Sequence, residues 1–283
     1  MVKAFLGMGL LGSNFVKAMR KRNEEVQVWN RTASKAQELE SVGAKSFADV
    51  QDAVKGAGII HVTLKDDASV DEVLEAASAG FAPNATIVDH TTTSKEGAIR
   101  RTAYWKDRGF IYQHAPVFMG PANALEGTGF MLLSGDEAVL AQLTPILAPM
   151  TGKIIHLGAE VGKAAAMKLV GNAFLVCYTF SLRETLAIGK ALGTSAEDLL
   201  GLLEQWNPGT QFVARMGRLT ASDHTEPSWE LAMARKDTQL FLNAAQNHEA
   251  SLALLPSIAG VMDRWIEQGF GSHDWTVVGS DVV

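Results

Sequence analysis

Two polar side chains, one that could transfer a proton and one that could orient it, stand four residues apart in an otherwise apolar stretch. Lys168 and Asn172 lie within residues 162–190, which contain no proline and place apolar residues every three or four positions. A separation of four puts both side chains on one face of a helix. An ammonium can donate a proton and stabilise a developing oxyanion, and an amide can orient a partner without titrating. The alternative is that Lys168 extends to water and Asn172 is simply tolerated.

The apolar periodicity predicts a single long helix over residues 162–190. At about 1.5 Å per residue this helix would be roughly 43 Å long, more than one domain usually requires. We therefore expect it to bridge two domains. The first would comprise residues 1–160, and the second would comprise the bridging helix and a helical region over residues 161–283.

A glycine-rich loop follows the first apolar run, residues 2–6. A helix-like segment at 13–22 and an alternating strand at 25–29 come next, so strand, G-x-G-x-x-G, helix and strand fall within one short unit. This is the setting in which such a loop binds the pyrophosphate of a dinucleotide at a helix N-terminus. The loop consists of Gly7, Met8, Gly9, Leu10, Leu11 and Gly12. We expect Gly7 to form the turn, Gly9 to admit the pyrophosphate and Gly12 to allow close helix–strand packing.

The end of the second strand indicates which dinucleotide is bound. A carboxylate there would accept hydrogen bonds from a free ribose 2′-hydroxyl, but the chain instead has Asn30, Arg31 and Thr32. Arg31 can pair with a 2′-phosphate and stack on adenine, and Asn30 and Thr32 can donate hydrogen bonds to it. The sequence therefore predicts NADP(H) as the cofactor. The alternative is a solvated Arg31, with Thr32 or Ser34 capping the next helix.

The alternation of strands and helices continues to about residue 160. Strands are predicted at 58–64, 86–90, 110–114, 129–134 and 153–157, and helices at 35–42, 49–55, 71–79 and 95–108. Beyond the long helix only helical periodicity appears, beginning with a capping box of Thr194 and Glu197. The expected fold class is α/β, a Rossmann-type doubly wound sheet of seven or eight strands, joined by the long bridging helix to an all-helical C-terminal domain.

Composition limits the possible partners. The 283 residues are 47% apolar and carry a net charge of −6, which disfavours nucleic acid. No uninterrupted apolar run of 18 residues and no secretory leader is seen, so we expect a cytoplasmic protein with no membrane partner. The single cysteine, Cys177, cannot form an internal disulfide and is expected in the core. The histidines are scattered, and no metal site is expected.

Four separated motifs occur together in this chain. They are GMGLLG at 7–12, HAPVFMG at 114–120 with EGT at 126–128, the spaced Gly162, Lys168 and Asn172, and Lys236-Asp237. In these motifs the chain resembles the β-hydroxyacid dehydrogenase family, also called the 3-hydroxyisobutyrate dehydrogenase family, over nearly its whole length. The cofactor loop WNRTASK is most similar to the glyoxylate and succinic semialdehyde reductase branch.

The resemblance implies roles for individual residues. Lys168 would be the catalytic lysine, and Asn172 would position the substrate. Thr92 would lie near the nicotinamide, and Lys236 would close over the cofactor. Leu64, which ends the strand at 58–64, is included in the expected cofactor site. The substrate would be bound by Val117, Phe118, Met119 and Gly120.

The substrate loop departs from the family pattern. The family usually has Asp where this chain has His114, and Ser-Gly where it has Phe118 and Met119. A hydroxyl that would bind a substrate carboxylate is therefore missing. The ring of Phe118 would line the pocket in its place, or it would point into the core and leave only backbone amides at the site. Three functions stay open. They are an NADPH-dependent reductase of small aldehydes or keto acids, a reductase of imines or less polar carbonyls, and a non-catalytic family member.

The second domain is expected to be too apolar to exist alone. It contains Trp206, Trp229, Trp265 and Trp275 among many leucines and alanines. A small helical domain buries too little surface to hide so many apolar groups. We expect a homodimer or homotetramer in which helices of the second domain pair.

Overall fold

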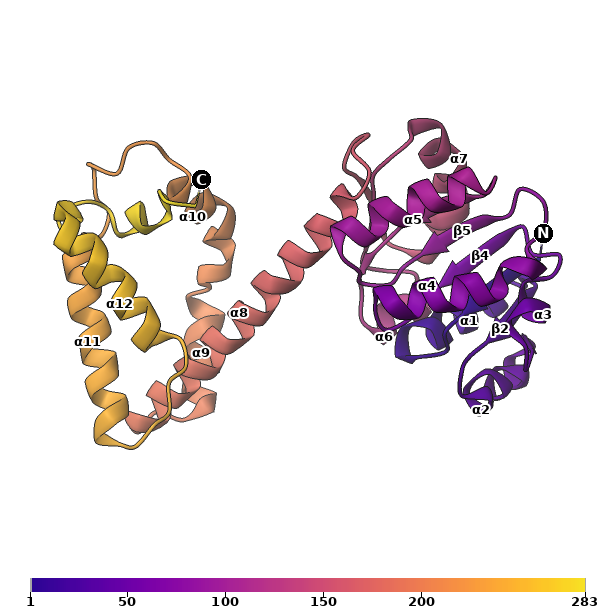
Figure 1. Cartoon of the computed structure of the whole chain (residues 1–283). Helices are drawn as coiled ribbons and strands as arrows, with labels where there is room; N and C mark the ends of the chain where they lie inside the picture. The colour runs from indigo at the N-terminus through magenta and orange to yellow at the C-terminus, as the bar shows by residue number, and fades with distance from the viewer. Residues whose placement is uncertain (1, 283) are drawn as a thin grey trace. The chain divides into compact units, whose positions relative to one another are not determined.

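The computed structural model describes residues 2–282 and divides them into two compact units (Figure 1). The first unit ends at Ala173 and the second begins at Phe174. Both residues belong to one continuous helix, α8 (Lys163–Ala191), as the periodicity predicts. The predicted domain boundary at 160–161 falls just before α8, whereas the two compact units meet inside this helix.

A six-stranded parallel sheet forms the centre of the first unit. Its order is β3-β2-β1-β4-β5-β6, so the chain moves outward in one direction, returns to β1 and continues on the other side. This reversal between β1 and β4 is the switch point at which Rossmann-type sheets bind ligands. The strands are β1 (Lys3–Leu6), β2 (Val26–Trp29), β3 (Lys45–Ser46), β4 (Ile59–Val62), β5 (Thr86–Asp89) and β6 (Ile111–His114).

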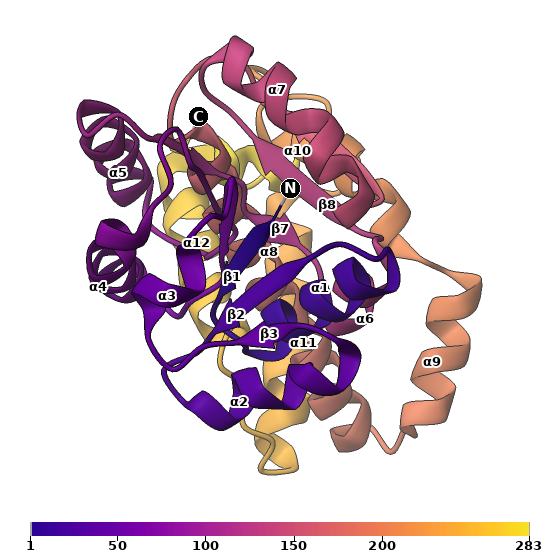
Figure 2. The ribbon, with the colours of Figure 1, turned by 90° about the vertical axis from the view of Figure 1, so that its right-hand side faces the viewer.

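Helices cover both faces of this sheet (Figure 2). In Figure 2, α3, α4 and α5 lie on one flank of the strands, and α1 and α6 lie on the other. The helices of the first unit are α1 (Leu10–Lys21), α2 (Ala33–Gln37), α3 (Val50–Val54), α4 (Asp67–Ala77), α5 (Lys95–Asp107), α6 (Pro121–Glu126) and α7 (Glu137–Leu147), with short turns at Glu38–Val42, Ser78–Gly80 and Ala148–Met150.

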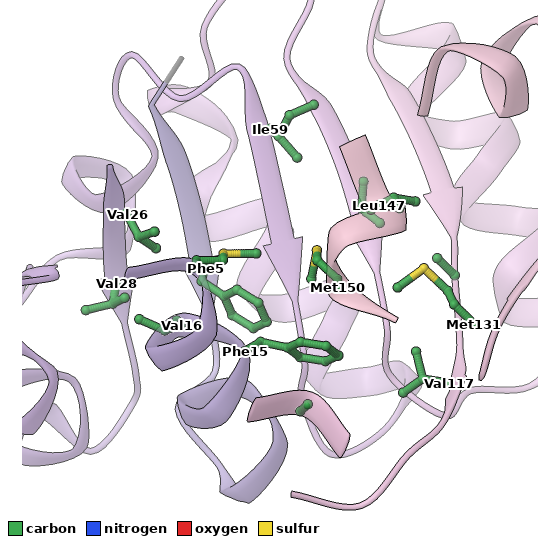
Figure 3. Close-up of a cluster of buried hydrophobic side chains, with 14 of the residues drawn as sticks. Phe5, Phe15, Val16, Val26, Val28, Ile59, Val117, Met131, Leu147 and Met150 are labelled. Atoms are coloured by element: carbon green, nitrogen blue, oxygen red, sulfur yellow. The ribbon is translucent and has the colours of Figure 1, made fainter. Parts of the chain in front are cut away.

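Alternate residues of β1 contribute to two separate cores. Phe5 packs with Phe15 of α1 and with residues of α6 and α7, as Figure 3 shows in part. Ala4 and Leu6 face the other way, into a core with α3, α4 and Trp105 of α5. Side chains alternate along a strand, so a sheet covered on both faces requires apolar residues at every position.

A second, three-stranded sheet corrects the predicted count of seven or eight strands in one sheet. It has the order β7-β8-β9, with β7 (Val117–Phe118), β8 (Phe130–Leu133) and β9 (Lys153–His156). The strands β3 and β7 are only two residues long, too short for an alternation to reveal them. β7 lies within the predicted substrate loop and pairs antiparallel with β8.

The second unit contains the rest of α8 and four further helices. They are α9 (Ala196–Gln205), α10 (Phe212–Leu219), α11 (Leu231–Asn247) and α12 (Leu255–Trp265), with short turns at Pro208–Gln211, Ile266–Phe270 and Trp275–Gly279. The capping box of α9 uses Ser195 and Asp198, one residue beyond the predicted pair of Thr194 and Glu197. A buried carboxylate joins two elements of this unit, because Glu184 of α8 accepts hydrogen bonds from the backbone N–H groups of residues 253–255, where α12 begins.

Much of α8 is apolar and exposed. By length and composition alone it could cross a membrane, with a mean hydropathy of 1.4 in its most apolar stretch. Val170, Leu175 and Val176 are more than half exposed. Cys177 is also exposed, so its predicted place in the core is wrong. Burial of a helical residue depends on the elements that pack against its face, and this part of α8 is exposed in the described structure.

Candidate functional site

The glycine-rich loop opens a cleft at the carboxyl ends of β1, β2 and β4. The cleft has a volume of about 600 Å³, within the usual range for small-molecule sites. Gly7 has φ +99°, and a Cβ there would lie 2.1 Å from the carbonyl oxygen of Thr63. A Cβ on Gly12 would lie 2.0 Å from the carbonyl oxygen of Gly7, whereas one on Gly9 would meet nothing within 4 Å. Gly7 and Gly12 thus allow backbone contacts, and Gly9 leaves space at the start of α1.

Asn30 fastens this loop to the end of β2. Its Oδ1 accepts from the N–H of Met8 at 2.9 Å, and its Nδ2 donates to the carbonyl oxygen of Thr32 at 2.9 Å. The prediction gave Asn30 a contact with the cofactor phosphate, and the structure adds this positioning role. Asn30, Arg31 and Thr32 all line the cleft, together with Lys35. Arg31 is exposed, as a group that contacts a soluble ligand must be.

The end of β4 contributes a wall that the sequence reasoning largely missed. Leu64 lines the cleft, and its N–H donates to Thr91 Oγ1 at 2.9 Å, which ties the ends of β4 and β5 together. Lys65 follows and brings a third positive charge to a cleft that also contains Arg31, Lys35 and one carboxylate, that of Glu72. Such a cluster favours an anionic ligand. The sequence could have placed Lys65 in the cleft, because it directly follows a predicted parallel strand, and the carboxyl ends of neighbouring parallel strands lie at the same edge of a sheet.

Several predicted cofactor residues do not line the cleft. Met8 and Gly12 are buried beneath the loop, and Thr92 is an exposed residue of the segment after β5. Lys236 belongs to α11 in the second unit, where its ammonium pairs with Asp237 at 2.7 Å. Of the predicted residues, the cleft is lined by Gly7, Gly9, Leu10, Leu11, Asn30, Arg31, Thr32 and Leu64.

Lys168 and Asn172 form a second cluster within the first unit. The Lys168 ammonium donates to Asn172 Oδ1 at 3.0 Å and lies 4.4 Å from the centre of the Phe118 ring. Lys168 is only 9% exposed, and burial lowers its pKa from the ordinary value of 10.5. These residues are not among those that line the glycine-rich cleft. The arrangement describes an oriented, partly desolvated ammonium rather than a lysine extending to water.

The other predicted substrate residues are less available. The Val117 side chain is buried in the core with Met131, so only its backbone could touch a substrate. Met119 packs partly against the same core. The Gly120 N–H already donates to Asn123 Oδ1 at 2.9 Å. Phe118 is therefore the member of this loop whose side chain meets the lysine cluster.

Across the described residues 2–282, no group of three His, Cys, Asp or Glu side chains is arranged to hold a metal ion.

Two family models match almost the entire chain. Residues 3–158 match the NAD-binding domain of 6-phosphogluconate dehydrogenase. Residues 162–279 match the NAD-binding domain of NADP-dependent 3-hydroxyisobutyrate dehydrogenase.

Individual proteins resemble this chain over similar lengths. An uncharacterized oxidoreductase of Bacillus subtilis is 26% identical over 97% of both chains. The chloroplastic glyoxylate/succinic semialdehyde reductase 2 of Arabidopsis thaliana is 26% identical over 97% of this chain and 77% of its own. Among solved structures, an imine reductase from Myxococcus stipitatus in complex with NADP+ superposes with a TM-score of 0.90, at 22% identity over the whole of both chains.

Proposed function

The chain belongs to the β-hydroxyacid dehydrogenase family, of the 3-hydroxyisobutyrate dehydrogenase type, and is an NAD(P)-dependent oxidoreductase. We propose that it is an NADPH-dependent reductase of the carbonyl group of small aldehydes or keto acids. The observation that carries the proposal is the buried Lys168 ammonium held by Asn172 in a chain with a dinucleotide cleft. The plant relative is a reductase of glyoxylate and succinic semialdehyde by name, which agrees with this substrate class.

The preference for NADPH rests on the charges of the cleft. Arg31 and Lys35 line it beside the end of β2, where no carboxylate stands to repel a 2′-phosphate. Asn30 is occupied with Met8 and Thr32, so Arg31 and Lys35 would carry most of the phosphate recognition. Arginine suits this task, because its planar guanidinium pairs with phosphate through two N–H groups.

Lys168 would serve as the general acid. When bound, the reduced nicotinamide supplies hydride to a carbonyl carbon. The Lys168 ammonium would hydrogen-bond the carbonyl oxygen, stabilise its developing negative charge and deliver the proton. Asn172 cannot titrate and holds the ammonium at 3.0 Å, so its role is to orient the acid. Burial lowers the pKa of Lys168, which makes the group a better proton donor near neutral pH.

The second candidate is a reductase of imines or less polar carbonyls. Phe118 favours it, because an aromatic ring next to Lys168 offers apolar contact in place of a carboxylate-binding hydroxyl. The similarity to a solved imine reductase agrees with this alternative. Lys168 itself favours carbonyl reduction, since an ammonium repels a protonated imine.

Steady-state NADPH oxidation with two substrate panels tests these functions. One panel contains aldehydes and keto acids from glyoxylate to aromatic aldehydes, and the other contains ketones mixed with amines. We expect turnover of the first panel, with kcat/KM rising from glyoxylate to larger, less polar carbonyls. Phe118→Ser should return the order toward small acids. Turnover only with ketone–amine mixtures would favour imine reduction, and NADPH binding without any turnover would favour a non-catalytic protein.

A second copy of this chain is the proposed partner of the exposed helices. Among the described residues, apolar side chains along α8 are exposed, and so is Trp206, at 63%. Trp265 and Trp275 pack against the small core of the second unit, whereas Leu200 of α9 and Val213 of α10 are exposed like Trp206. Light scattering at micromolar concentration should give a dimer or tetramer, and a monomer would contradict this expectation.

A further inference from the structure

The Phe118 ring lies on a surface of α8 made by three residues of one helical face. Lys168, Gly171 and Asn172 are separated by three and four positions, so they adjoin on the helix. The ring centre is 4.4 Å from the Lys168 ammonium. The same ring lies over Gly171, where there is no side chain. Phe118 thus reaches the helix at the point where the lysine cluster is formed.

Gly171 provides the space that the ring occupies. A Cβ built on Gly171 would lie 2.3 Å and 2.7 Å from two carbons of the Phe118 ring. Carbon atoms cannot approach so closely, so any larger residue would force the ring away. Glycine inside a helix is less stable than alanine, because it loses more backbone freedom on folding. The position of the ring gives a physical reason for a glycine here.

The ring also limits the directions open to the ammonium. One of its three N–H donors is directed to Asn172 Oδ1, and the Phe118 face covers another side. Among the described residues no further hydrogen-bond acceptor is recorded for Lys168. One donor direction is therefore left for the oxygen of a substrate.

We infer that Phe118 and Gly171 are a matched pair of positioning residues, in which the bare backbone at 171 seats the aromatic ring that aims the Lys168 ammonium and keeps it charged. The contact between Phe118 and Gly171 is independent of the proposed function, whereas its importance for catalysis rests on that function. The negative face of an aromatic ring attracts a cation, which favours the protonated lysine. This attraction opposes the effect of burial, which lowers the pKa of Lys168.

The contact between the ring and Gly171 is tested by the change in melting temperature that Gly171→Ala causes, which should have opposite signs with and without Phe118. Gly171→Ala in the parent protein should lower the melting temperature by about 4 °C or more, because the new methyl group collides with Phe118. In a Phe118→Ala background the same substitution should raise it by about 1 to 4 °C, because only the helix preference remains. The control is Gly201→Ala in α9, where a Cβ would meet nothing within 4 Å. It should raise the melting temperature in both backgrounds.

A titration tests the effect on the ammonium without any substrate. In protein labelled with 13C-lysine, the signal of Lys168 is assigned by its loss in Lys168→Arg. Phe118→Leu keeps an apolar cover without an aromatic face and should lower the pKa of Lys168 by about 0.5 to 1.5 units. Gly171→Ala should also lower the pKa of Lys168, because it displaces the ring, and Gly201→Ala should leave this pKa unchanged.

The outcomes separate the inference from the proposed function. An equal effect of Gly171→Ala in both backgrounds, or an unchanged titration of Lys168 in Phe118→Leu, would overturn the matched pair. If the melting temperatures and the Lys168 titration both behave as expected and NADPH is oxidised, the alkaline limb of the pH profile of kcat should move with the pKa of Lys168. If the melting temperatures and the titration both behave as expected but no carbonyl is reduced, the pairing of Phe118 with Gly171 is supported and the proposed function is contradicted.

Discussion

Acid is expected to weaken the first unit through two histidines buried in its sheet. His61 of β4 and His90, directly after β5, stack against each other and pack against Phe5 and Phe15. His90 Nδ1 lies 2.9 Å from the carbonyl oxygen of Ala115, which can only accept, so this nitrogen carries the hydrogen. His90 Nε2 then accepts from His61 Nδ1 at 3.0 Å. His61 Nε2 is left without a partner among the described residues.

This arrangement suits neutral histidines only. A proton added to His90 Nε2 would face the N–H of His61, and one added to His61 Nε2 would find no acceptor. Burial lowers the pKa of His90 from 6.5 to about 4 and that of His61 well below 6.5. In the unfolded chain both side chains gain a proton near pH 6.5. Their contribution to stability is therefore complete above pH 6.5 and is lost as the pH falls toward 4.

The expected loss can be worked out for pH 7 to pH 5. A histidine whose pKa is about 4 when folded and 6.5 when unfolded loses about 2 kcal/mol of unfolding free energy over this interval. The pKa of His61 is also lowered well below 6.5, and burial lowers that of His114 in β6, so both add to the loss in the same direction. Free carboxylates titrate near pH 4 and contribute little in this range.

Urea unfolding at pH 7 and pH 5 measures this loss, with pulsed hydrogen exchange of β4 and β5 reporting on the first unit. His61→Asn should lose less stability than the parent between these pH values, because its amide can still donate to His90 but does not titrate, while His90 and His114 still do. His156→Asn is the matched control. Since His156 is exposed, this variant should lose as much unfolding free energy between pH 7 and pH 5 as the parent does. Equal stability of the parent at both pH values, or an undiminished loss in His61→Asn, would refute the reasoning.

Three further substitutions test the cofactor cleft, the lysine cluster and the second unit. Arg31→Ala should remove most of a preference for NADPH over NADH of about 10- to 150-fold in kcat/KM, since charge-assisted hydrogen bonds contribute about 1.5 to 3 kcal/mol; equal use of both cofactors by the parent would contradict this assignment. Lys168→Ala should lower kcat about 100-fold or more while the Kd of NADPH, from fluorescence titration, stays nearly unchanged; a kcat within a few-fold of the parent would rule out the lysine as the acid. Glu184→Ala should destabilise the second unit by about 2 to 4 kcal/mol in urea unfolding, because the N–H groups at the start of α12 lose a buried carboxylate, whereas the exposed Glu204→Ala should change it by less than about 0.5 kcal/mol.

The sequence alone was sufficient for the features that depend on local spacing. The G-x-G-x-x-G at 7–12 between a strand and a helix, the apolar strands and the long proline-free helix each predict their element from neighbouring residues. The separation of Lys168 and Asn172 likewise places them on one helical face, and they are hydrogen-bonded in the structure. The family expected from the same motifs agrees with the two family models, which match residues 3–158 and 162–279.

Tertiary structure alone decided what each side chain meets. Val117 and Phe118 are adjacent in the sequence, yet the pairing of β7 with β8 directs Val117 into the core and leaves Phe118 against α8. The contact between Phe118 and Gly171 joins residues more than 50 positions apart, which no periodicity can reveal. Cys177 was assigned to the core because cysteine is usually buried, but burial depends on the elements around a helix and not on residue type. Local spacing therefore determines which faces exist, and only the packing of distant segments determines which of those faces are covered.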